Sequence, residues 1–514
     1  MVEFFKKYFL FFTVFLTGAG VLIIEVVAMR VLAPYYGNTI FTASSVITVI
    51  LAALSIGYYA GGRLADRYRS LRLFFTIILF SGLCLLFFHF ASFAIIPAQS
   101  LVFSIITGPL VSSLFLFFLP ALLLGTISPY AIKLQTVYFP EQGVGTVAGK
   151  IFFWSTLGSI VGSLSAGFVL IPNFGINQII VATGAALVFL GLVPLINIGL
   201  DKKILDKYII VFFVIMTAAV LSGYETNKKI IYSKDGVYEK IIIYEGEHSG
   251  RPARFFAQDH SLSGASFLDS QNPSDMVFDY TKYYRLYKIL KPDAKEVLII
   301  GGGAYSIPKA ILHELPDASV DVSEIEPSLF DLAKKYFGAK DNPSLRNVTE
   351  DGRRFLRLSE KKYDMIFSDV YFSLYSVPPH FTTQEFFKIA KEKLNKDGIL
   401  IMNIIGDLSL GGASLIMSEA KTLRTVFENS YFFAVDSPQK KGAQNVIFVG
   451  YNSGKKIDFN DSLIINHQDD IIRQLKDKAI DMDKFDLSSE IVLSDNYSPV
   501  EYLTAKVLKK NFGY

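Results

Sequence analysis

The chain has 514 residues, of which 51% are hydrophobic and 19% are charged, and its formal net charge is +3. This length predicts two or more domains, and so small a net charge, without a basic stripe interleaved with aromatic residues, argues against nucleic acid as a partner. Cys84 is the single cysteine and the six histidines are scattered along the chain, so we expect neither a disulfide framework nor a bound metal ion.

Residues 1–224 carry few charges, and we expect them to form a transmembrane domain of about seven helices in a lipid bilayer. Lys6 and Lys7 precede an apolar run in the manner of a signal peptide, but Tyr8 to Ala28 is long enough to span, which predicts a retained first helix. Region 95–132 leaves room for a further short or re-entrant element. The expected helices lie near residues 8–30, 44–62, 71–94, 108–132, 147–171, 176–198 and 208–224.

The loops between these helices predict the orientation. Lysine and arginine residues occur in alternate loops and are absent from the loops near 31–43, 95–107 and 172–175. The positive-inside rule therefore places the N-terminus in the cytoplasm and indicates a multi-pass protein of the plasma membrane. Small residues in the fifth helix predict close approach to a neighbouring helix; they are Gly158, Gly162, Ser165 and Gly167.

Two ionisable residues, Glu25 and Arg30, lie in or at the edge of the first expected span. One interpretation is a polar site or substrate path through the membrane domain, because ionisable groups are costly in the bilayer. A structural ion pair or an interfacial arginine explains them equally well, and the sequence leaves both interpretations open.

The second half of the chain has the composition of a soluble protein. Residues 225–285 alternate apolar and polar positions, which predicts a small β-meander and a linking helix near 274–290. In residues 286–514 short apolar runs alternate with helical segments, which predicts an α/β Rossmann-like domain with a doubly wound parallel sheet. Helices are expected near 327–337, 383–394 and 412–427, and strands near 346–349, 364–368, 398–404, 431–435 and 445–450.

A nucleotide-binding motif lies near the start of this domain. The apolar run Val297–Ile300 leads into Gly301-Gly302-Gly303, and a second run, Val320–Val322, ends beside Glu324. The glycines let the backbone approach a nucleotide closely, and an acid about twenty residues further on can accept hydrogen bonds from two ribose hydroxyls. This βαβ unit therefore predicts a ligand that contains a nucleoside.

Further motifs follow in order. They are Glu324-Ile325-Glu326, Glu350-Asp351-Gly352-Arg353-Arg354-Phe355, Tyr363-Asp364-Met365-Ile366-Phe367-Ser368-Asp369, His380-Phe381-Thr382-Thr383-Gln384-Glu385-Phe386-Phe387 and Asp495-Asn496-Tyr497-Ser498-Pro499-Val500-Glu501. With the glycine loop, they resemble the spermidine synthase (polyamine aminopropyltransferase) family in its membrane-fused bacterial and archaeal branch. The resemblance covers almost the whole chain, and it implies a methyltransferase-type fold whose last two strands form an antiparallel hairpin at the sheet edge.

The resemblance implies a transferase of polyamine biosynthesis that moves the aminopropyl group of decarboxylated S-adenosylmethionine to a small-molecule amine acceptor. Asp369 takes the position of the family's catalytic aspartate, and Tyr280 and Tyr371 are the expected substrate contacts. Soluble family members commonly self-associate, so a homo-oligomer is a further expectation. The residues expected to bind the donor are Gly301, Gly302, Gly303, Glu324, Asp351 and Gly352.

These residues also have purely structural interpretations. Glu324 and Asp369 end strands, where acids commonly cap the next helix, and Asp351 fits an exposed turn. Tyr280 fits a core aromatic residue equally well. His380 follows two prolines and is expected to line a lid or to lie on the surface, without acting as a base.

The chain departs from the family pattern at three positions. Ala304 stands where soluble members carry an acid after the third glycine, and Phe372 stands where they carry a second acid near the catalytic one. Ser263 aligns with a glutamine of the family's β-meander. Because the lost carboxylates attract cationic amines, we expect an acceptor that is less charged or larger than a simple diamine.

Two other functions are open at this point. A methyltransferase would use intact S-adenosylmethionine, and Ala304 favours it by removing an acid that would repel the additional carboxylate. A transporter or sensor would bind the nucleoside as a regulatory ligand. An odd number of spans would place the C-terminal half outside the cell, away from a donor made in the cytosol, so the side of the catalytic domain is left open.

Overall fold

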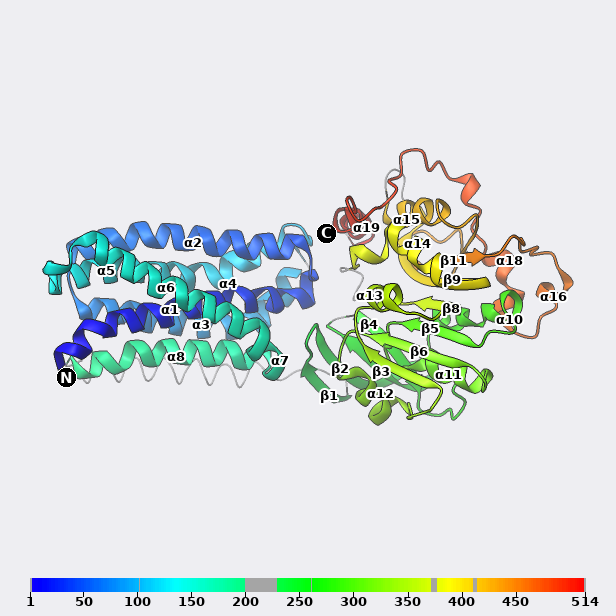
Figure 1. The fold of residues 1–514 in the computed structure, drawn as a ribbon, viewed down its shortest axis with the longest axis horizontal. Helices are drawn as coiled ribbons and strands as arrows, with labels where there is room; N and C mark the ends of the chain where they lie inside the picture. The colour runs from blue at the N-terminus through cyan, green and yellow to red at the C-terminus, as the bar shows by residue number, and fades with distance from the viewer. Residues whose placement is uncertain are drawn as a thin grey trace. The chain divides into compact units, whose positions relative to one another are not determined.

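The computed structural model describes residues 2–100, 102–198, 229–259, 261–370, 377–409 and 414–512. The chain forms two compact units, Met1–Asn227 and Lys228–Tyr514. The first is helical, and the second is an α/β unit with two sheets (Figure 1).

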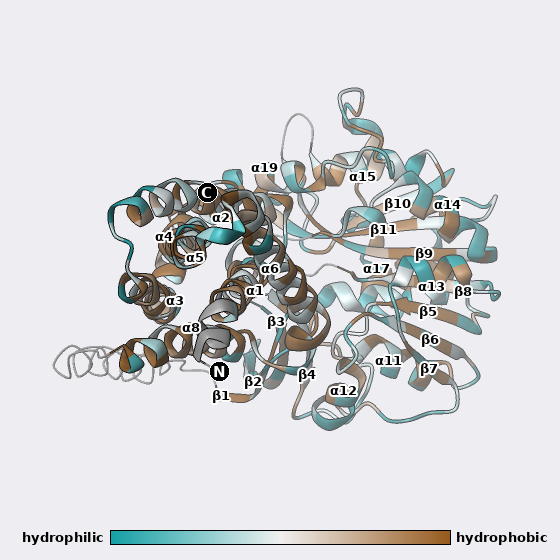
Figure 2. Cartoon of the chain, turned by 60° about the vertical axis from the view of Figure 1, so that its left-hand side comes forward, coloured by the Kyte–Doolittle hydropathy of each residue, from teal (hydrophilic) through white to brown (hydrophobic). Residues whose placement is uncertain are grey.

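Six helices or helix pairs in the described part of the first unit are long and apolar enough to cross a membrane. Figure 2 shows hydrophobic residues along most of their length. The expected unit of long apolar helices is confirmed, whereas the seventh expected helix, 208–224, lies outside the described residues. The helices are α1 (Val2–Tyr36), α2 (Ile40–Arg67), α3 (Leu71–Ser100), α4 (Gly108–Gly125), α5 (Ile127–Tyr138), α6 (Val144–Ser165), α7 (Ile171–Asn173) and α8 (Ile176–Asn197), with a 3-10 helix η1 (Pro140–Gln142) and a π-helix η2 (Ala166–Leu170).

The fourth span consists of two helices, α4 and α5, which meet at Thr126. In region 95–132, where a further short or re-entrant element was allowed for, α3 extends to Ser100 and no helix begins among described residues 102–107. The short helix in this region is α5, which completes the fourth span.

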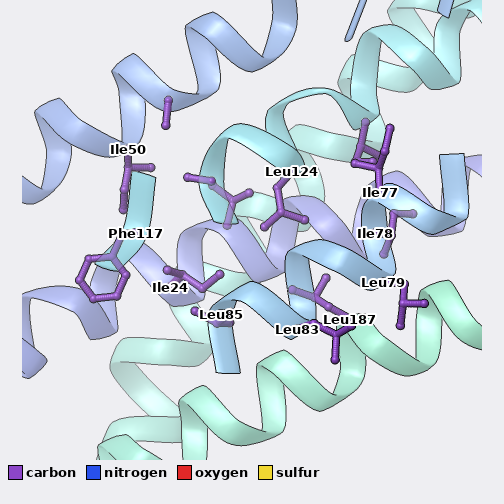
Figure 3. Packing of buried hydrophobic residues seen from close by; sticks show 14 of the residues in the cluster. Ile24, Ile50, Ile77, Ile78, Leu79, Leu83, Leu85, Phe117, Leu124 and Leu187 are labelled. Atoms are coloured by element: carbon purple, nitrogen blue, oxygen red, sulfur yellow. The ribbon is translucent and has the colours of Figure 1, made fainter. Parts of the chain in front are cut away.

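Glycines set two of the helix contacts in this unit. A Cβ atom on Gly158 or Gly162 of α6 would collide with the backbone of α1, so the prediction of close approach is confirmed at these positions. It is wrong at Gly167, where a Cβ atom would meet nothing within 4 Å. Helices α3 and α8 approach at Gly82 and contribute Leu79, Leu83 and Leu187 to one apolar cluster (Figure 3).

The α/β unit begins with an antiparallel sheet of order β1-β2-β3-β4. Its strands are β1 (Lys229–Asp235), β2 (Lys240–His248), β3 (Arg251–Gln258) and β4 (Ser261–Phe267). The linking helix expected over 274–290 is shorter than predicted, since it starts as a 3-10 helix, η3 (Asp279–Leu286), and continues as α10 (Tyr287–Leu290). The 3-10 segment places Tyr280 beside the larger sheet, where the candidate site lies.

The larger sheet has seven strands in the order β10-β11-β9-β8-β5-β6-β7. Strands β5 to β9 pair in parallel, while β11 inserts antiparallel between β9 and β10. This order confirms the methyltransferase-type fold and its closing hairpin. The strands are β5 (Glu296–Ile300), β6 (Ser319–Glu324), β7 (Leu345–Thr349), β8 (Tyr363–Ser368), β9 (Leu394–Asp407), β10 (Asn429–Ala434) and β11 (Ala443–Asn452).

Both faces of this sheet are covered. On β5, Val297 and Ile299 point into one apolar cluster, and Leu298 and Ile300 into a second one on the opposite face. A parallel sheet buried on both faces requires such a continuous apolar run. The helices and turns of the unit are α11 (Ser306–Glu314), α12 (Leu329–Phe337), α13 (Gly352–Leu358), η4 (Pro379–Phe381), α14 (Gln384–Lys393), α15 (Leu415–Arg424), α16 (Ser462–Ile465), α17 (Asp470–Arg473), α18 (Leu475–Lys478), η5 (Met482–Lys484) and α19 (Val500–Phe512).

Candidate active site

A cavity of about 620 Å³ lies at the carboxyl ends of the central parallel strands. Strand β6 pairs with one side of β5 and β8 with the other, so the chain reverses its winding direction between them. In open α/β sheets, ligands bind in the crevice at this topological switch point. Residues of β4 and η3 in the α/β unit complete the cavity wall.

The glycine loop after β5 forms the cavity floor. Gly301 and Gly303 have positive φ angles of 91° and 52°, which favour glycine. The amide of Gly301 donates to the carbonyl of Ser323 over 2.9 Å, which joins the loop to β6. A side chain at position 301 would collide with the carbonyl oxygen of Asp369, so only glycine lets the ends of β5 and β8 come this close.

Glu324 ends β6 and is 6% exposed. Its carboxylate accepts hydrogen bonds from the amides of Gly302 (2.7 Å) and Glu326 (2.8 Å). Burial raises the pKa of Glu324, and the hydrogen bonds from these amides oppose the rise. The carboxylate is therefore held rigidly beside the glycine loop, with lone pairs available for further donors.

Asp351 caps α13 and also faces the cavity. One carboxylate oxygen accepts the amide of Arg354 (2.8 Å), and the other lies 3.0 Å from Nε2 of His380. Burial works against the charged form, but the hydrogen bonds from His380 and the backbone outweigh it and lower the pKa of Asp351. The helix-cap and ligand-facing interpretations of this residue are therefore compatible.

His380 lines the cavity, and its segment is tied to α13 and to the C-terminal region. Arg353 donates to the carbonyl of His380 (3.0 Å) and forms two hydrogen bonds with the carboxylate of Asp495 (2.6 and 2.7 Å). The C-terminal motif that begins at Asp495 thus supports the edge of the site, although it does not line the cavity.

Asp369 follows β8 and lies at the centre of the site. Its amide donates to the carbonyl of Ile300 (2.9 Å), and its carboxylate accepts Nδ2 of Asn403 (3.0 Å) and the hydroxyl of Tyr280. Burial raises the pKa of Asp369, and the two hydrogen bonds oppose that rise. A carboxylate in this state is a stronger base than an exposed one and can accept a proton from a ligand.

The structure brings together nearly all the residues singled out in the sequence. Tyr280 packs against an apolar cluster of the unit and its hydroxyl also binds Asp369, so the core and substrate-side interpretations are compatible. Tyr371 and Phe372 lie outside the described residues. The predicted residues that line this cavity are Tyr280, Gly301, Gly302, Gly303, Glu324, Asp351, Gly352 and Asp369, with Ser263, Ala304 and His380 beside them.

Two asparagines of the site were not predicted. Asn403 on β9 is 3% exposed and accepts a hydrogen bond of 2.8 Å from Asn445 on β11. The signal for Asn403 was a single polar residue inside the apolar run Ile399–Ile405. A buried polar residue requires a hydrogen-bond partner. A lone polar residue inside an apolar strand, with no partner evident from the sequence, therefore indicates a functional position.

Comparison with known proteins finds the following similarities. Residues 284–461 match the family model for the spermine/spermidine synthase domain. The polyamine aminopropyltransferase of Vibrio vulnificus is 27% identical over 244 residues, covering 46% of this chain and 78% of the relative. Polyamine aminopropyltransferase 2 of Aquifex aeolicus is 23% identical over 414 residues, covering 76% of this chain and 77% of the relative. A probable spermidine synthase from Corynebacterium glutamicum has a TM-score of 0.40 and 20% identity over 45% of this chain and 83% of its own.

Proposed function

We propose that this chain, in which residues 284–461 match the spermine/spermidine synthase domain, transfers the aminopropyl group of decarboxylated S-adenosylmethionine to an amine. The observation that supports this function most strongly is the shared cavity of Glu324 and Asp369. The Glu324 carboxylate lies beside the glycine loop, and the Asp369 carboxylate lies on the opposite side of the switch point.

The nucleoside end of the cavity suits an adenosyl group. In the proposed complex, Glu324 accepts the ribose hydroxyls through its remaining lone pairs. Asp351 accepts the exocyclic amino group of the base, and the loop Gly301–Gly303, with Gly352 nearby, lets the ligand approach the backbone closely. The donor sulfonium then lies near Asp369, whose negative charge stabilises it.

The reaction needs one base and one leaving group. The amine nitrogen attacks the aminopropyl carbon bonded to sulfur, a C–N bond forms, and the C–S bond breaks. The bonding electrons return to sulfur, so neutral methylthioadenosine leaves without further chemistry. Asp369 takes the proton that the attacking nitrogen loses, and Tyr280 and Asn403 hold the carboxylate in position.

We propose that residues 1–224 anchor this enzyme as a transmembrane domain with a cytoplasmic N-terminus, followed by a small sheet domain to residue 285 and the catalytic domain from 286 to 514. The apolar helices support the membrane placement. Reporter fusions after Tyr224 test which side the catalytic domain faces: activity of a cytoplasmic reporter indicates an even number of spans, and activity of a periplasmic one indicates an odd number.

The decisive experiment uses the full chain purified in detergent. Decarboxylated S-adenosylmethionine or S-adenosylmethionine is supplied with a panel of amines, and the adenosyl product is identified by chromatography. We expect methylthioadenosine and an aminopropylated amine, both lost in Asp369→Asn and retained in Glu360→Gln, a change at an exposed residue. Formation of S-adenosylhomocysteine would instead establish a methyltransferase. Nucleoside binding without turnover would favour a sensor or transporter.

A further inference from the structure

The cavity has two chemically different sides, which follow from the strand order. Across the carboxyl ends of the sheet, β6 and β5 lie on one side of β8, and β9 and β11 lie on the other (Figure 1). Glu324 and the glycine loop therefore define the nucleoside side. The side beyond Asp369, formed by β9, β11 and the turn between β10 and β11, is left for the acceptor; we call it the acceptor side.

The acceptor side is built mainly from amides and aliphatic groups. Its lining residues are Asn403, Ile405, Val435, Asp436, Ala443, Gln444 and Asn445. Asp436 is the one ionisable residue among them. The composition differs from that of the nucleoside side, which includes Glu324, Glu350 and Asp351.

The exposed carboxylates at the cavity rim already have cationic partners. Asp436 lies 2.6 Å from Nζ of Lys440, and Asp279, the first residue of η3, lies 2.6 Å from Nζ of Lys282. Because each lysine offsets the charge of its carboxylate, neither acid attracts a second cation as strongly as an unpaired one would. On the acceptor side, Asp369 is then the carboxylate that has no cationic partner among the described residues.

Amide groups connect Asp369 to the far part of this side. Asn445 donates to Oδ1 of Asn403 (2.8 Å), and Asn403 donates to Oδ1 of Asp369 (3.0 Å). The side-chain oxygen of Gln444 is already hydrogen-bonded within the turn, because it accepts the backbone amides of Asp436 and Ser437. Asn403 and Asn445 each use one of their two N–H groups in this chain of hydrogen bonds, and the carboxamide of Asn445 is left as a neutral polar group lining the cavity.

We infer that the acceptor is a monoamine whose far end carries a neutral hydrogen-bonding group, such as a hydroxyl or an amide, in place of a second ammonium. This inference rests on the proposed aminopropyl transfer. The donor itself brings a sulfonium and an ammonium into the cavity, and Asp369 is needed by both the sulfonium and the attacking nitrogen. A second ammonium on the acceptor would be desolvated against amides, without a carboxylate to compensate it.

The test compares two acceptors of equal length, 1,4-diaminobutane and 4-amino-1-butanol, with the full chain and decarboxylated S-adenosylmethionine. Methylthioadenosine and the aminopropylated amine are both measured. We expect kcat/KM for the amino alcohol to exceed that for the diamine at least about tenfold, a difference of 1.4 kcal/mol in transition-state free energy. A diamine that reacts as well or better overturns the inference but leaves aminopropyl transfer standing. Absence of methylthioadenosine with every amine overturns both.

A charge variant makes the test independent of the wild-type preference. Lys440→Gln frees the carboxylate of Asp436, and we expect it to raise kcat/KM for the diamine several-fold while the amino alcohol is unaffected. Lys441→Gln is the matched control, because it removes the same charge from the same turn at an exposed residue that forms no ion pair with Asp436. Equal responses of the two variants, or no response to Lys440→Gln, would contradict the inference.

Discussion

The two sides of the cavity are built in different ways. On the nucleoside side, Glu324 and the glycine loop occupy short motifs at the ends of adjacent parallel strands, and backbone amides hold the carboxylate. On the acceptor side, side chains from η3, β9 and β11 converge on Asp369. Binding of the adenosyl group, which both the aminopropyl donor and S-adenosylmethionine contain, thus depends on local backbone geometry. Acceptor choice depends on side chains that are far apart in the sequence.

The largest effect is expected at the junction of the two sides. Asp369→Asn removes the base while leaving the nucleoside side intact, so we expect kcat to fall about 1,000-fold. Calorimetry should show that methylthioadenosine binds with little change. Loss of nucleoside binding in this variant would mean that the two sides are not separable.

The complementary change is Glu324→Gln on the nucleoside side. It replaces a charged acceptor by a neutral one and places an amide hydrogen against a backbone donor. We expect Kd for methylthioadenosine to rise about 100-fold, since hydrogen bonds to charged groups contribute roughly 1.5–3 kcal/mol. With saturating donor, kcat should recover much of its value. A large loss of kcat with unchanged Kd would instead assign Glu324 to the chemical step.

A smaller effect is expected from Tyr280→Phe, and it has a defined sign. The hydroxyl of Tyr280 lowers the pKa of Asp369 by donating to its charged form, so its removal lets burial raise that pKa further. Transfer requires ionised Asp369, and the acidic limb of the kcat profile should therefore move to higher pH. Turnover well above that limb should change much less. An unmoved limb would show that another group controls it.

The smallest expected effect is on stability. Burial raises the pKa of Asp369 in the folded state, so ionising this acid costs more in the fold than in the unfolded chain. At pH 7.5 we expect Asp369→Asn to unfold at the same temperature as the wild type or at a higher one. Below the unfolded pKa of about 3.9, the difference should disappear. A clearly lower unfolding temperature at pH 7.5 would contradict this explanation.

Much of the fold followed from local patterns. The apolar runs of β5 and β6 and the helices between successive strands predicted the doubly wound sheet, since only a parallel sheet covered on both faces buries such runs. The linking helix over 274–290 was overestimated because helical periodicity does not distinguish a 3-10 segment, which is where Tyr280 lies. Gly167 was wrongly grouped with Gly158 and Gly162, because spacing alone does not show which glycines face another helix.

The sequence by itself determined the nucleoside side: strand-end residues such as Glu324 and Asp369 must meet at one edge once the strands run parallel. The tertiary structure alone decided the acceptor side. Asn445 reaches Asn403 because β11 inserts antiparallel next to β9, and the same hairpin brings Asp436 and its partner Lys440 to the cavity rim. Hydrogen bonds and ion pairs between distant segments depend on register and strand order, which no local pattern encodes.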